Sequence, residues 1–386
     1  MQTDRRTRVL SLFWNFTVGG VAQYVALLEG VATCAPISIR SFSVLGPRHH
    51  ANYALLDKLG DRVVVHRTAP WDIGWVHRLR EELRVWSPDI VMSHGFNSHF
   101  MARIAATLSD TPFRPVCSYH GLYHPPTPVR HLIGGVYNRF TEYYIRHRAC
   151  STVAVADHCR RYLLDKGVAP ERIEAIHNGI PDTGQDPVAR TRLREEWGIR
   201  SEEILVGVAS RLDPVKGVAY LVDAFGRVAG RYPQAKLVLI GAGSLDDLLR
   251  AQVAALGLSD RVVFTGFRTD IAACLDAMDV FVLPSLAEYH SIGLLEAMRA
   301  AKAIIATDVG GNTESARHEQ EALIVSPADT AAIAAALERL FSDVTLCNRL
   351  GQKARERFLA EFTVDQMVGR TAKWLERIAS QPVPCR

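Results

Sequence analysis

Short hydrophobic runs alternate with stretches of helical periodicity along most of the chain. In the first part of the chain these runs occupy residues 9–13, 37–44, 63–66, 90–93, 115–119, 152–155 and 173–177. Such runs are typical of strands that are buried on both faces, and the helical stretches between them supply the right-handed crossovers of a parallel sheet. The first part is therefore predicted to form a parallel sheet with helices on both faces.

A second series of the same kind begins after residues 181–187 (PDTGQDP), which are rich in turn formers and are the best linker candidate. We predict an α/β chain with two Rossmann-like, doubly wound domains, residues 1–184 and 185–362. Ligands bind beyond the carboxyl ends of the strands in such sheets, which predicts a site in a cleft between the two halves. The second series of runs occupies residues 204–210, 235–240, 261–265, 280–284, 303–307 and 322–325.

The composition is that of an ordinary globular protein, with 386 residues of which 48% are hydrophobic and 22% are charged. The net charge of +4 is too small to indicate nucleic-acid binding. Residues 1–186 hold 21 basic and 16 acidic side chains, whereas the remainder holds 24 and 25, so the positive excess lies in the first half. The seven cysteines are scattered, and neither a signal peptide nor a membrane-spanning run is evident. We expect a cytoplasmic protein with reduced thiols.

The strongest chemical signal follows the strand predicted at residues 204–210. Arg211 comes directly after this strand, and Lys216 with Gly217 opens the next helix. The unpaired N–H groups of a helix start and two fixed positive charges together form an anion site. The alternative is a pair of solvated surface cations, which is common for so short a motif.

Two glutamates form a candidate second part of this site. Glu288 and Glu296 are eight residues apart, which on one continuous helix would place them about 80° apart and off a common face. They can converge if Glu288 lies in a loop and Glu296 lies in the first turns of the following helix. A carboxylate there would accept hydrogen bonds from the vicinal hydroxyls of a ribose, and amides near Ser291 and Ile292 would meet phosphate. The alternative is an exposed loop acid and a helix-start acid that the helix dipole favours.

The first half holds weaker candidates. Gly19 and Gly20 follow the first strand, where glycine lets the backbone approach a ligand closely. His94 and His120 each follow a strand end, and His120 is the better candidate for the site. A packing turn and hydrogen-bonded structural histidines are the alternatives.

Residues 129–148 mix apolar side chains with several arginines. A basic amphipathic helix of this kind can lie on an anionic membrane surface, which would place the protein at the inner face of a membrane. The other interpretation is that its apolar face packs on the sheet.

Motifs for common cofactors are absent from the sequence. Gly241-Ala242-Gly243 lacks the third glycine of a dinucleotide site, and the chain has neither a P-loop nor an Asp-x-Asp pair. We therefore expect no cofactor and no metal ion.

The order of the motifs resembles that of retaining glycosyltransferases of the GT-B fold, family 4 type, over nearly the whole chain. Each matching segment is short, but seven segments in the family's order argue against an accidental match. The segments are FWNFTVGG at 13–20, SYHG at 118–121, IHNGIP at 176–181, ASRLDPVKG at 209–217, VVFTGF at 262–267, the pair Glu288 and Glu296, and DVGGNTE at 308–314.

The resemblance implies that a nucleotide-diphosphate sugar binds mainly to the second domain and that the acceptor binds to the first. By position, Arg211 and Lys216 would contact the diphosphate, Glu296 the ribose, and Glu288 the donor sugar or its loop.

The resemblance also implies roles in the first domain. Gly20 would contact the phosphates through its backbone, and His120 would lie near the reacting sugar. Residues 363–386 would form a helix that crosses back to the first domain. The chain departs from the family pattern at Tyr289, where glycine is frequent, and at residues 301–303, where Ala-Lys-Ala replaces Gly-Lys-Pro.

The resulting hypothesis is transfer of a hexosyl unit from a UDP- or GDP-sugar to a glycan or lipid-linked acceptor, with retention and without metal. Such a reaction would serve cell-envelope or exopolysaccharide synthesis. Arg211, Lys216 and helix N-terminal amides would stabilise the charge that grows on the leaving diphosphate. Two alternatives stay open, since fold does not determine function. One is a sugar-nucleotide epimerase or a phosphorylase on the same scaffold, and the other is a non-catalytic sugar-nucleotide-binding partner.

Overall fold

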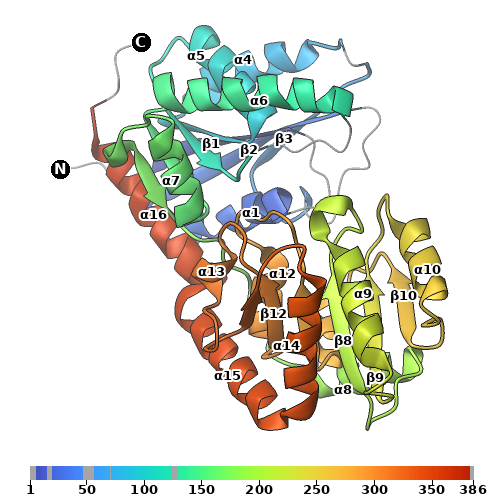
Figure 1. Ribbon diagram of the computed structural model, residues 1–386. Coiled ribbons are helices and arrows are strands. Elements are labelled where there is room, and N and C mark those ends of the chain that lie inside the picture. Colours follow the sequence, from blue (N-terminus) through green and yellow to red (C-terminus); the bar gives the residue numbers. More distant parts are fainter. Residues whose placement is uncertain (1–5, 15–19, 47–55, 70, 123–127, 383–386) are drawn as a thin grey trace. The chain divides into compact units, whose positions relative to one another are not determined.

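The computed structural model describes residues 6–14, 20–46, 56–69, 71–122 and 128–382, and contacts divide the chain into two compact units (Figure 1). One unit combines Met1–Gly179 with Val364–Arg386, and the other is Ile180–Thr363. The division falls where the Ile180 N–H donates to the Phe362 carbonyl at 3.1 Å. Residues 180–184, which the linker pattern assigned to the first domain, therefore belong to the second unit.

The first unit is built on a seven-stranded parallel sheet with the strand order β3-β2-β1-β4-β5-β6-β7. The order reverses between β1 and β4, as expected for a doubly wound sheet. All of the strands predicted in this half are present, with ends within two residues of the predicted bounds. The strands are β1 (Thr7–Trp14), β2 (Ile37–Leu45), β3 (Arg62–His66), β4 (Ile90–His94), β5 (Arg114–Tyr119), β6 (Ser151–Ala154) and β7 (Ile173–Ala175).

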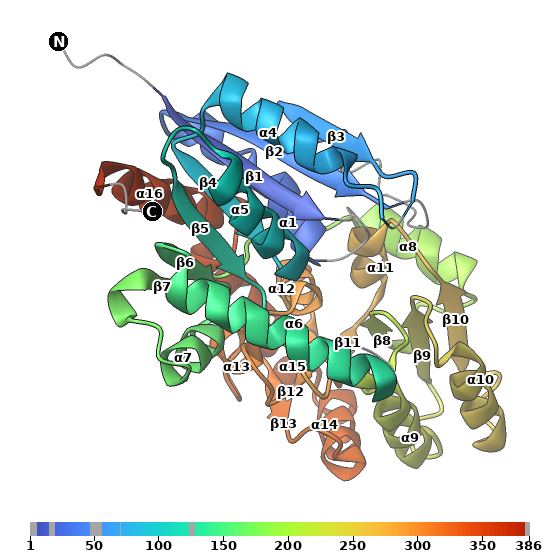
Figure 2. The ribbon, with the colours of Figure 1, turned by 90° about the horizontal axis from the view of Figure 1, so that it is seen from above.

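Helices cover both faces of this sheet. The ribbons of α4, α5 and α6 lie over one face, and those of α1 and α16 lie over the other (Figures 1 and 2). Helix α2 shares an apolar cluster with α1 and α16. The bounds are α1 (Gly20–Leu28), α2 (Val31–Cys34), α4 (Gly74–Trp86), α5 (Phe96–Leu108), α6 (Pro128–His147), α7 (Asp157–Asp165), the 3-10 turn η1 (Pro170–Arg172) and α16 (Val364–Ser380).

The last helix, α16, completes the core of the first unit. Met367, Trp374 and Leu375 are each at most 2% exposed and share one apolar cluster with α1, β1 and β4. The Trp374 Nε1 donates to the Ser151 hydroxyl at 3.2 Å, which satisfies the only polar group of the buried indole. The C-terminal segment is therefore part of the first unit's hydrophobic core, although the whole second unit precedes it in sequence.

Helix α6 packs its aromatic side chains on α5. The ring of Tyr137 stacks on Phe96 at a centroid distance of 3.8 Å, and Phe140 meets the same ring edge-on at 5.4 Å. Val136 and Tyr143 remain 61% and 48% exposed. Among the helices that the structure describes, none combines the length and the apolar character that a membrane span requires.

The second unit is built on a six-stranded parallel sheet with the order β10-β9-β8-β11-β12-β13. Alternate side chains of its central strands enter two different cores, as with Val282 on one face of β11 and Phe281 on the other. The predicted strands of this half are also all present. They are β8 (Ile204–Ala209), β9 (Ala235–Ile240), β10 (Val262–Gly266), β11 (Val280–Leu283), β12 (Ala303–Thr307) and β13 (Leu323–Val325).

Helices again cover both faces. Helices α9 and α14 pack together over one face, and α8, α11, α12 and α15 share the core on the other. The bounds are α8 (Pro187–Glu196), η2 (Pro214–Lys216), α9 (Val218–Ala229), α10 (Asp246–Ala255), α11 (Ile271–Ala277), α12 (Ile292–Arg299), α13 (Asn312–Ser315), α14 (Thr330–Ser342) and α15 (Val344–Glu361).

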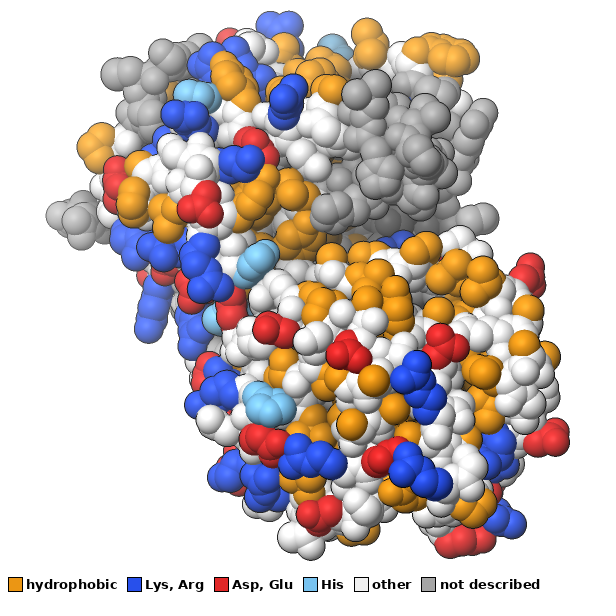
Figure 3. All heavy atoms as spheres, in the orientation of Figure 1, with side chains coloured by type: hydrophobic (Ala, Val, Ile, Leu, Met, Phe, Trp, Pro, Cys, Tyr) orange, Lys and Arg blue, Asp and Glu red, His pale blue; other side chains and the backbone are white. Residues whose placement is uncertain are grey.

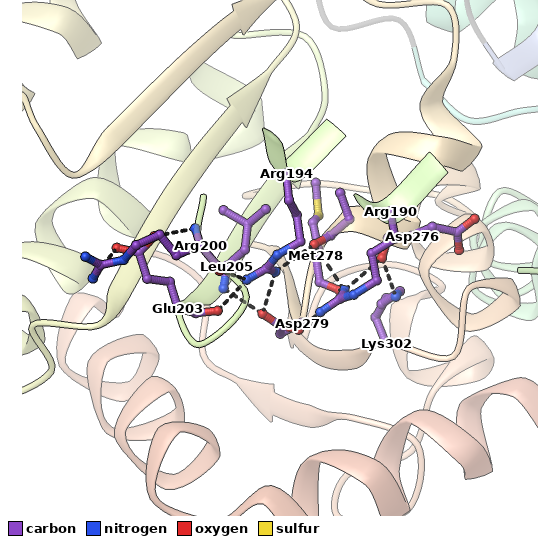
Figure 4. Close-up of polar contacts among 10 residues, drawn as sticks. Arg190, Arg194, Arg200, Glu203, Leu205, Asp276, Met278, Asp279 and Lys302 are labelled. Atoms are coloured by element: carbon purple, nitrogen blue, oxygen red, sulfur yellow. Dashed lines mark hydrogen bonds and ion pairs between the residues drawn. The ribbon is translucent and has the colours of Figure 1, made fainter. Parts of the chain in front are cut away.

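A polar network fixes α8 to the amino ends of β8 and β11 (Figure 4). The Asp279 carboxylate accepts from Arg190 at 2.6 Å, from Arg194 at 3.1 Å and from the Leu205 amide at 2.7 Å. Because the Arg194 side chain is only 6% exposed, its charge requires this partner. The network therefore ties α8 to the amino ends of the strands. The loops of the candidate site lie at the opposite, carboxyl ends.

Lys302, in the Ala-Lys-Ala segment that departs from the family pattern, belongs to the same edge (Figure 4). Its Nζ donates to the Asp276 carbonyl in the last turn of α11 at 3.0 Å, and burial lowers the pKa of this amine to about 8. A cation at the C-terminal end of a helix is favoured by the helix dipole. Lys302 therefore has a structural role, because it binds the C-terminal end of α11.

Candidate functional site

The loops that follow β8, β11 and β12 pack backbone against backbone at the carboxyl edge of the second sheet. Gly217 starts α9 with φ +62°, and a side chain there would overlap the Pro284 carbonyl in the loop after β11. Gly310, in the loop after β12, has φ +55°, and a side chain there would overlap the Glu288 carbonyl. Only glycine fits at such close approaches with a positive φ. The two glycines therefore determine how closely the three loops approach one another.

Lys216 and Glu288 meet within this group of loops. The Lys216 Nζ lies 2.6 Å from Glu288 Oε1, and the Ser285 hydroxyl donates to the same oxygen at 2.7 Å. The two charged side chains are only 20% and 10% exposed. The pair is further tied by the Leu286 amide, which donates to the Val215 carbonyl at 2.8 Å. The structure thus brings together two residues that lie 72 positions apart in sequence, and it orients both at the strand ends.

Arg211 lies at the same strand end, but its side chain is exposed to solvent. Its side chain is 69% exposed, and its Nη1 pairs with Asp213 at 2.5 Å. Asp213 also accepts from the Ser244 hydroxyl in the loop after β9 at 3.1 Å. An exposed pair of this kind stabilises little, so the guanidinium can exchange its partner for an anionic ligand at small cost.

Helix α12 presents the other predicted residues. Ser291 is its N-cap, with a side chain that accepts from the Leu294 amide at 3.4 Å, and Ile292 is the first helical residue. Glu296 lies in the second turn of this helix and Glu288 in the loop before it, the placement under which the two glutamates could converge. Burial raises the pKa of Glu296 to about 7, and the nearby Arg299 lowers it by a smaller amount. Within the described ranges, no hydrogen bond or ion pair joins Glu296 to Lys216 or Glu288.

The loop that carries Glu288 is anchored by a histidine that the sequence did not single out as a site residue. His290 is 6% exposed, and its Nε2 lies 3.2 Å from the Ser315 hydroxyl of α13. Its ring also lies against Phe362 at a centroid distance of 5.8 Å. His290 therefore positions the loop between Glu288 and α12, beside Tyr289.

In the first unit, a buried aromatic cluster lies at the carboxyl ends of β4 and β5. His120 meets the Tyr24 ring at 4.8 Å, and His94 lies 6.2 Å from His120. The His94 Nε2 is 3.1 Å from the Ser11 hydroxyl. Tyr24 lies on α1 and has no sequence signal beyond the apolar stripe of that helix.

Burial makes both imidazoles of this cluster neutral at pH 7. It lowers the pKa of His120 to about 4, and it lowers the pKa of His94 well below its ordinary value. Burial also raises the pKa of Tyr24 to about 12. The cluster can therefore offer hydrogen bonds to a ligand, but it cannot offer a positive charge.

The predicted glycines of the first half are placed differently. Gly20 is the first residue of α1 and is exposed, so its backbone lies at a helix start. Gly19 lies outside the described residues.

On the face of the second unit shown in Figure 3, acidic and basic side chains are interspersed and form no patch of one sign. This face of the second unit therefore presents no broad positive surface to an anionic ligand.

Replacing Gly310 by alanine is expected to lower the free energy of unfolding by about 2–4 kcal/mol, because strain at positive φ adds to the clash with the Glu288 carbonyl. Gly257→Ala is the matched control, since Gly257 has φ +67° but a Cβ added there would meet no atom within 4 Å. Urea denaturation measures the free energy of unfolding of both variants. Equal decreases in the two variants would contradict the close packing of these loops.

Comparisons with known proteins cover both halves of the chain. Residues 18–183 match the family model described as Glycosyltransferase Family 4, and residues 189–357 match the model described as Glycosyl transferases group 1. The chain is 27% identical over 308 residues to the putative glycosyltransferase EpsD of Bacillus subtilis, covering 77% of this chain and 80% of EpsD.

Two further proteins extend the comparison. The chain is 27% identical over 293 residues to an Escherichia coli protein named UDP-Gal:alpha-D-GlcNAc-diphosphoundecaprenol alpha-1,3-galactosyltransferase, covering 73% of each. The crystal structure of Anabaena HepE in complex with UDP-glucose superposes with a TM-score of 0.83 at 21% identity, over 96% of this chain and 100% of HepE.

Proposed function

Because the chain belongs to the group 1 glycosyltransferases of the family 4 type and has the GT-B fold, we propose that it transfers a hexosyl unit from a UDP-sugar with retention of configuration. The acceptor is a glycan or a lipid-linked sugar of the cell envelope or of an exopolysaccharide. The complex of HepE with UDP-glucose supports the choice of nucleotide, and the acceptor in the name of the Escherichia coli relative supports a lipid-linked substrate.

The observation that carries the proposal is the contact of Lys216 with Glu288 at the carboxyl edge of the second sheet. The diphosphate of the donor gains negative charge as its bond to the sugar breaks, and a fixed ammonium group stabilises that charge. Glu288 holds the ammonium in place and can accept a hydrogen bond from a hydroxyl of the donor sugar. Arg211 and the amides at Ser291 and Ile292 complete the binding of the diphosphate.

Glu296 and His120 are assigned supporting roles. The Glu296 carboxylate accepts hydrogen bonds from the two ribose hydroxyls, for which its place on α12 is suited. His120, which is neutral at pH 7, donates or accepts one hydrogen bond near the reacting sugar. Neither residue forms a covalent bond to the sugar.

The proposed step uses the donor's own phosphate as the base. The acceptor oxygen forms a bond to the anomeric carbon on the face from which the diphosphate departs. The acceptor's proton passes to the departing phosphate oxygen. Because side chains and amides of this chain balance the charge, we propose that the reaction needs no metal ion.

A two-stage experiment tests this function. A thermal-shift panel of UDP-glucose, UDP-galactose, UDP-N-acetylglucosamine and GDP-mannose is expected to show stabilisation by a UDP-sugar. Incubation with that donor and a lipid-linked or glycan acceptor, with EDTA present, should give a product with the donor's anomeric configuration by NMR. An inverted product would refute retention, activity that returns only with added metal would refute metal independence, and conversion of the donor without an acceptor would indicate an epimerase.

Contact with an anionic membrane is a further part of the proposal, supported by the basic excess of the first half and the exposed side chains of α6. Phosphatidylglycerol vesicles are expected to sediment the protein at low salt and to release it at high salt. Arg139→Glu, on an exposed position of α6, should weaken binding, whereas Arg80→Glu on α4 should not. An absence of binding at low salt would contradict this part.

A further inference from the structure

A cavity of about 390 Å³ opens in the first unit between the last turns of α5 and α6. Its remaining walls come from the segments that lead into three strands. Phe113 precedes β5, Cys150 precedes β6 and Arg172 precedes β7. The cavity therefore lies at the amino edge of the first sheet.

This position separates the cavity from the histidine cluster of the same unit. His94 and His120 lie at the carboxyl ends of β4 and β5, and the six residues of β5 span about 20 Å. The cavity is thus distinct from the site to which the proposed function assigns His120.

Two arginines give the cavity a positive lining. Arg103 and Arg148 line it, and none of the residues that line it is acidic. Neither Arg103 nor Arg148 forms an ion pair with a carboxylate in the part of the chain that the structure describes. Arg103 is half-buried, and Arg148 is exposed with its Nη2 donating to the Tyr143 hydroxyl at 3.5 Å, so no carboxylate of the described residues compensates either charge.

Arg172 differs from these cations because its charge is already compensated. It donates to the carbonyls of Ile145 and Arg146 at the end of α6, each at 2.9 Å. These carbonyls carry the negative end of the helix dipole. Because Arg172 already binds these carbonyls, the negative end of the α6 dipole does not neutralise the charges of Arg103 and Arg148.

Most of the remaining lining is apolar and already packed. Ala102 and Ala106 of α5 line the cavity together with Phe113. Tyr144 is 1% exposed, and its ring stacks on His99 with an interplanar angle of 11°. Ligand binding therefore requires little additional ordering of side chains, and contact with these walls stabilises the apolar body of a ligand.

We propose that this cavity binds a small amphiphilic organic anion. Its phosphate or carboxylate lies between Arg103 and Arg148, where planar guanidinium groups form charge-assisted hydrogen bonds with such groups. Its apolar body lies against Ala102, Ala106 and Phe113. A soluble phosphate ester and the headgroup of a membrane lipid share this chemistry.

Isothermal titration with phenyl phosphate tests the proposal on the full-length protein. Saturable binding is expected with a Kd of about 1 mM or lower. Inorganic phosphate, which lacks the apolar body, and phenol, which lacks the anion, should each bind at least about ten-fold more weakly. Arg103→Ala should weaken the binding of phenyl phosphate by about ten-fold or more, whereas Arg80→Ala on α4 should leave it unchanged.

A second variant separates binding in the cavity from attraction to surface charge. Ala106→Phe fills the apolar part without changing the charge, and it should abolish the binding of phenyl phosphate in a protein with an unchanged circular dichroism spectrum.

Vesicles of phosphatidylcholine with phosphatidic acid distinguish a membrane lipid from a soluble phosphate ester as the source of the anion. Vesicle binding lost in Arg103→Ala indicates a lipid headgroup, and binding of phenyl phosphate alone indicates a soluble ligand. Phenyl phosphate that binds equally to wild type and Arg103→Ala overturns the proposal, as does the absence of saturable binding.

Discussion

Replacing Lys216 by alanine is expected to lower kcat for glycosyl transfer by about 10²-fold or more, the loss that follows removal of one preorganised charge contact at a developing anion. The Lys216 ammonium is held 2.6 Å from Glu288 in a largely buried position, so a solvent cation cannot replace it with the same geometry. A smaller change is expected in KM for the donor, because the charge on the leaving diphosphate grows in the transition state. Steady-state kinetics with the UDP-sugar selected by thermal shift measure both constants.

Two control variants define this result. Lys353→Ala removes an exposed lysine that pairs with Glu356 on the surface, and it should leave kcat unchanged. Lys216→Arg keeps the charge and should retain more activity than Lys216→Ala. Near wild-type turnover in a folded Lys216→Ala protein would remove Lys216 from the catalytic residues.

Glu296→Gln is expected to weaken donor binding by about ten-fold or more near pH 8, because it removes a charged acceptor from two ribose hydroxyls. The pH dependence is the more specific part of this prediction. The pKa of Glu296 is raised to about 7, so the free protein binds a proton there below pH 7. If the donor requires the carboxylate, its Kd rises about ten-fold for each pH unit below 7 in the wild type. In Glu296→Gln the Kd should stay constant, as titrations with UDP-glucose between pH 5.5 and 8 would show.

The same carboxyl group has an effect on stability that does not depend on any ligand. In the unfolded chain Glu296 ionises near its ordinary value of 4.5, so between that pH and 7 the folded state holds more protons. The free energy of unfolding therefore falls as pH rises through this window, by up to about 3 kcal/mol. Glu296→Gln should remove this decline, and Glu356→Gln, at a half-exposed surface position, should not. A wild type whose urea midpoint is equally high at pH 5 and pH 8 would contradict the raised pKa.

Several features of the molecule were accessible from sequence because they are local. The hydrophobic runs predicted the strands of both sheets, since a strand that is buried on two faces requires consecutive apolar side chains. Glu288 lies in a loop and Glu296 on the following helix, the placement that their spacing allowed. The sequence predicted that Ser291 offers its backbone amide to phosphate, and the structure adds that its side chain caps that helix.

Other features depend on contacts between distant segments. The assignment of residues 180–184 to the second unit follows from the Ile180 contact with Phe362, and these residues are 182 positions apart. Tyr24 joins the histidine cluster because α1 packs beside the ends of β4 and β5. The cavity near Arg103 arises where α5, α6 and the starts of three strands meet, so no single segment carries its pattern.

The amino-acid sequence alone determined the fold class, the order of the strands along the chain and the family, because these follow from local hydrophobic patterns and from short motifs in a particular order. Only the tertiary structure decided that Lys216 pairs with Glu288, that Glu296 is crowded enough to raise its pKa, and that His120 is neutral. The physical reason is that charge states and pairings depend on burial and on distances across loops. Those distances are determined by backbone contacts, such as those of Gly217 and Gly310, which form only when separate strands have been assembled into one sheet.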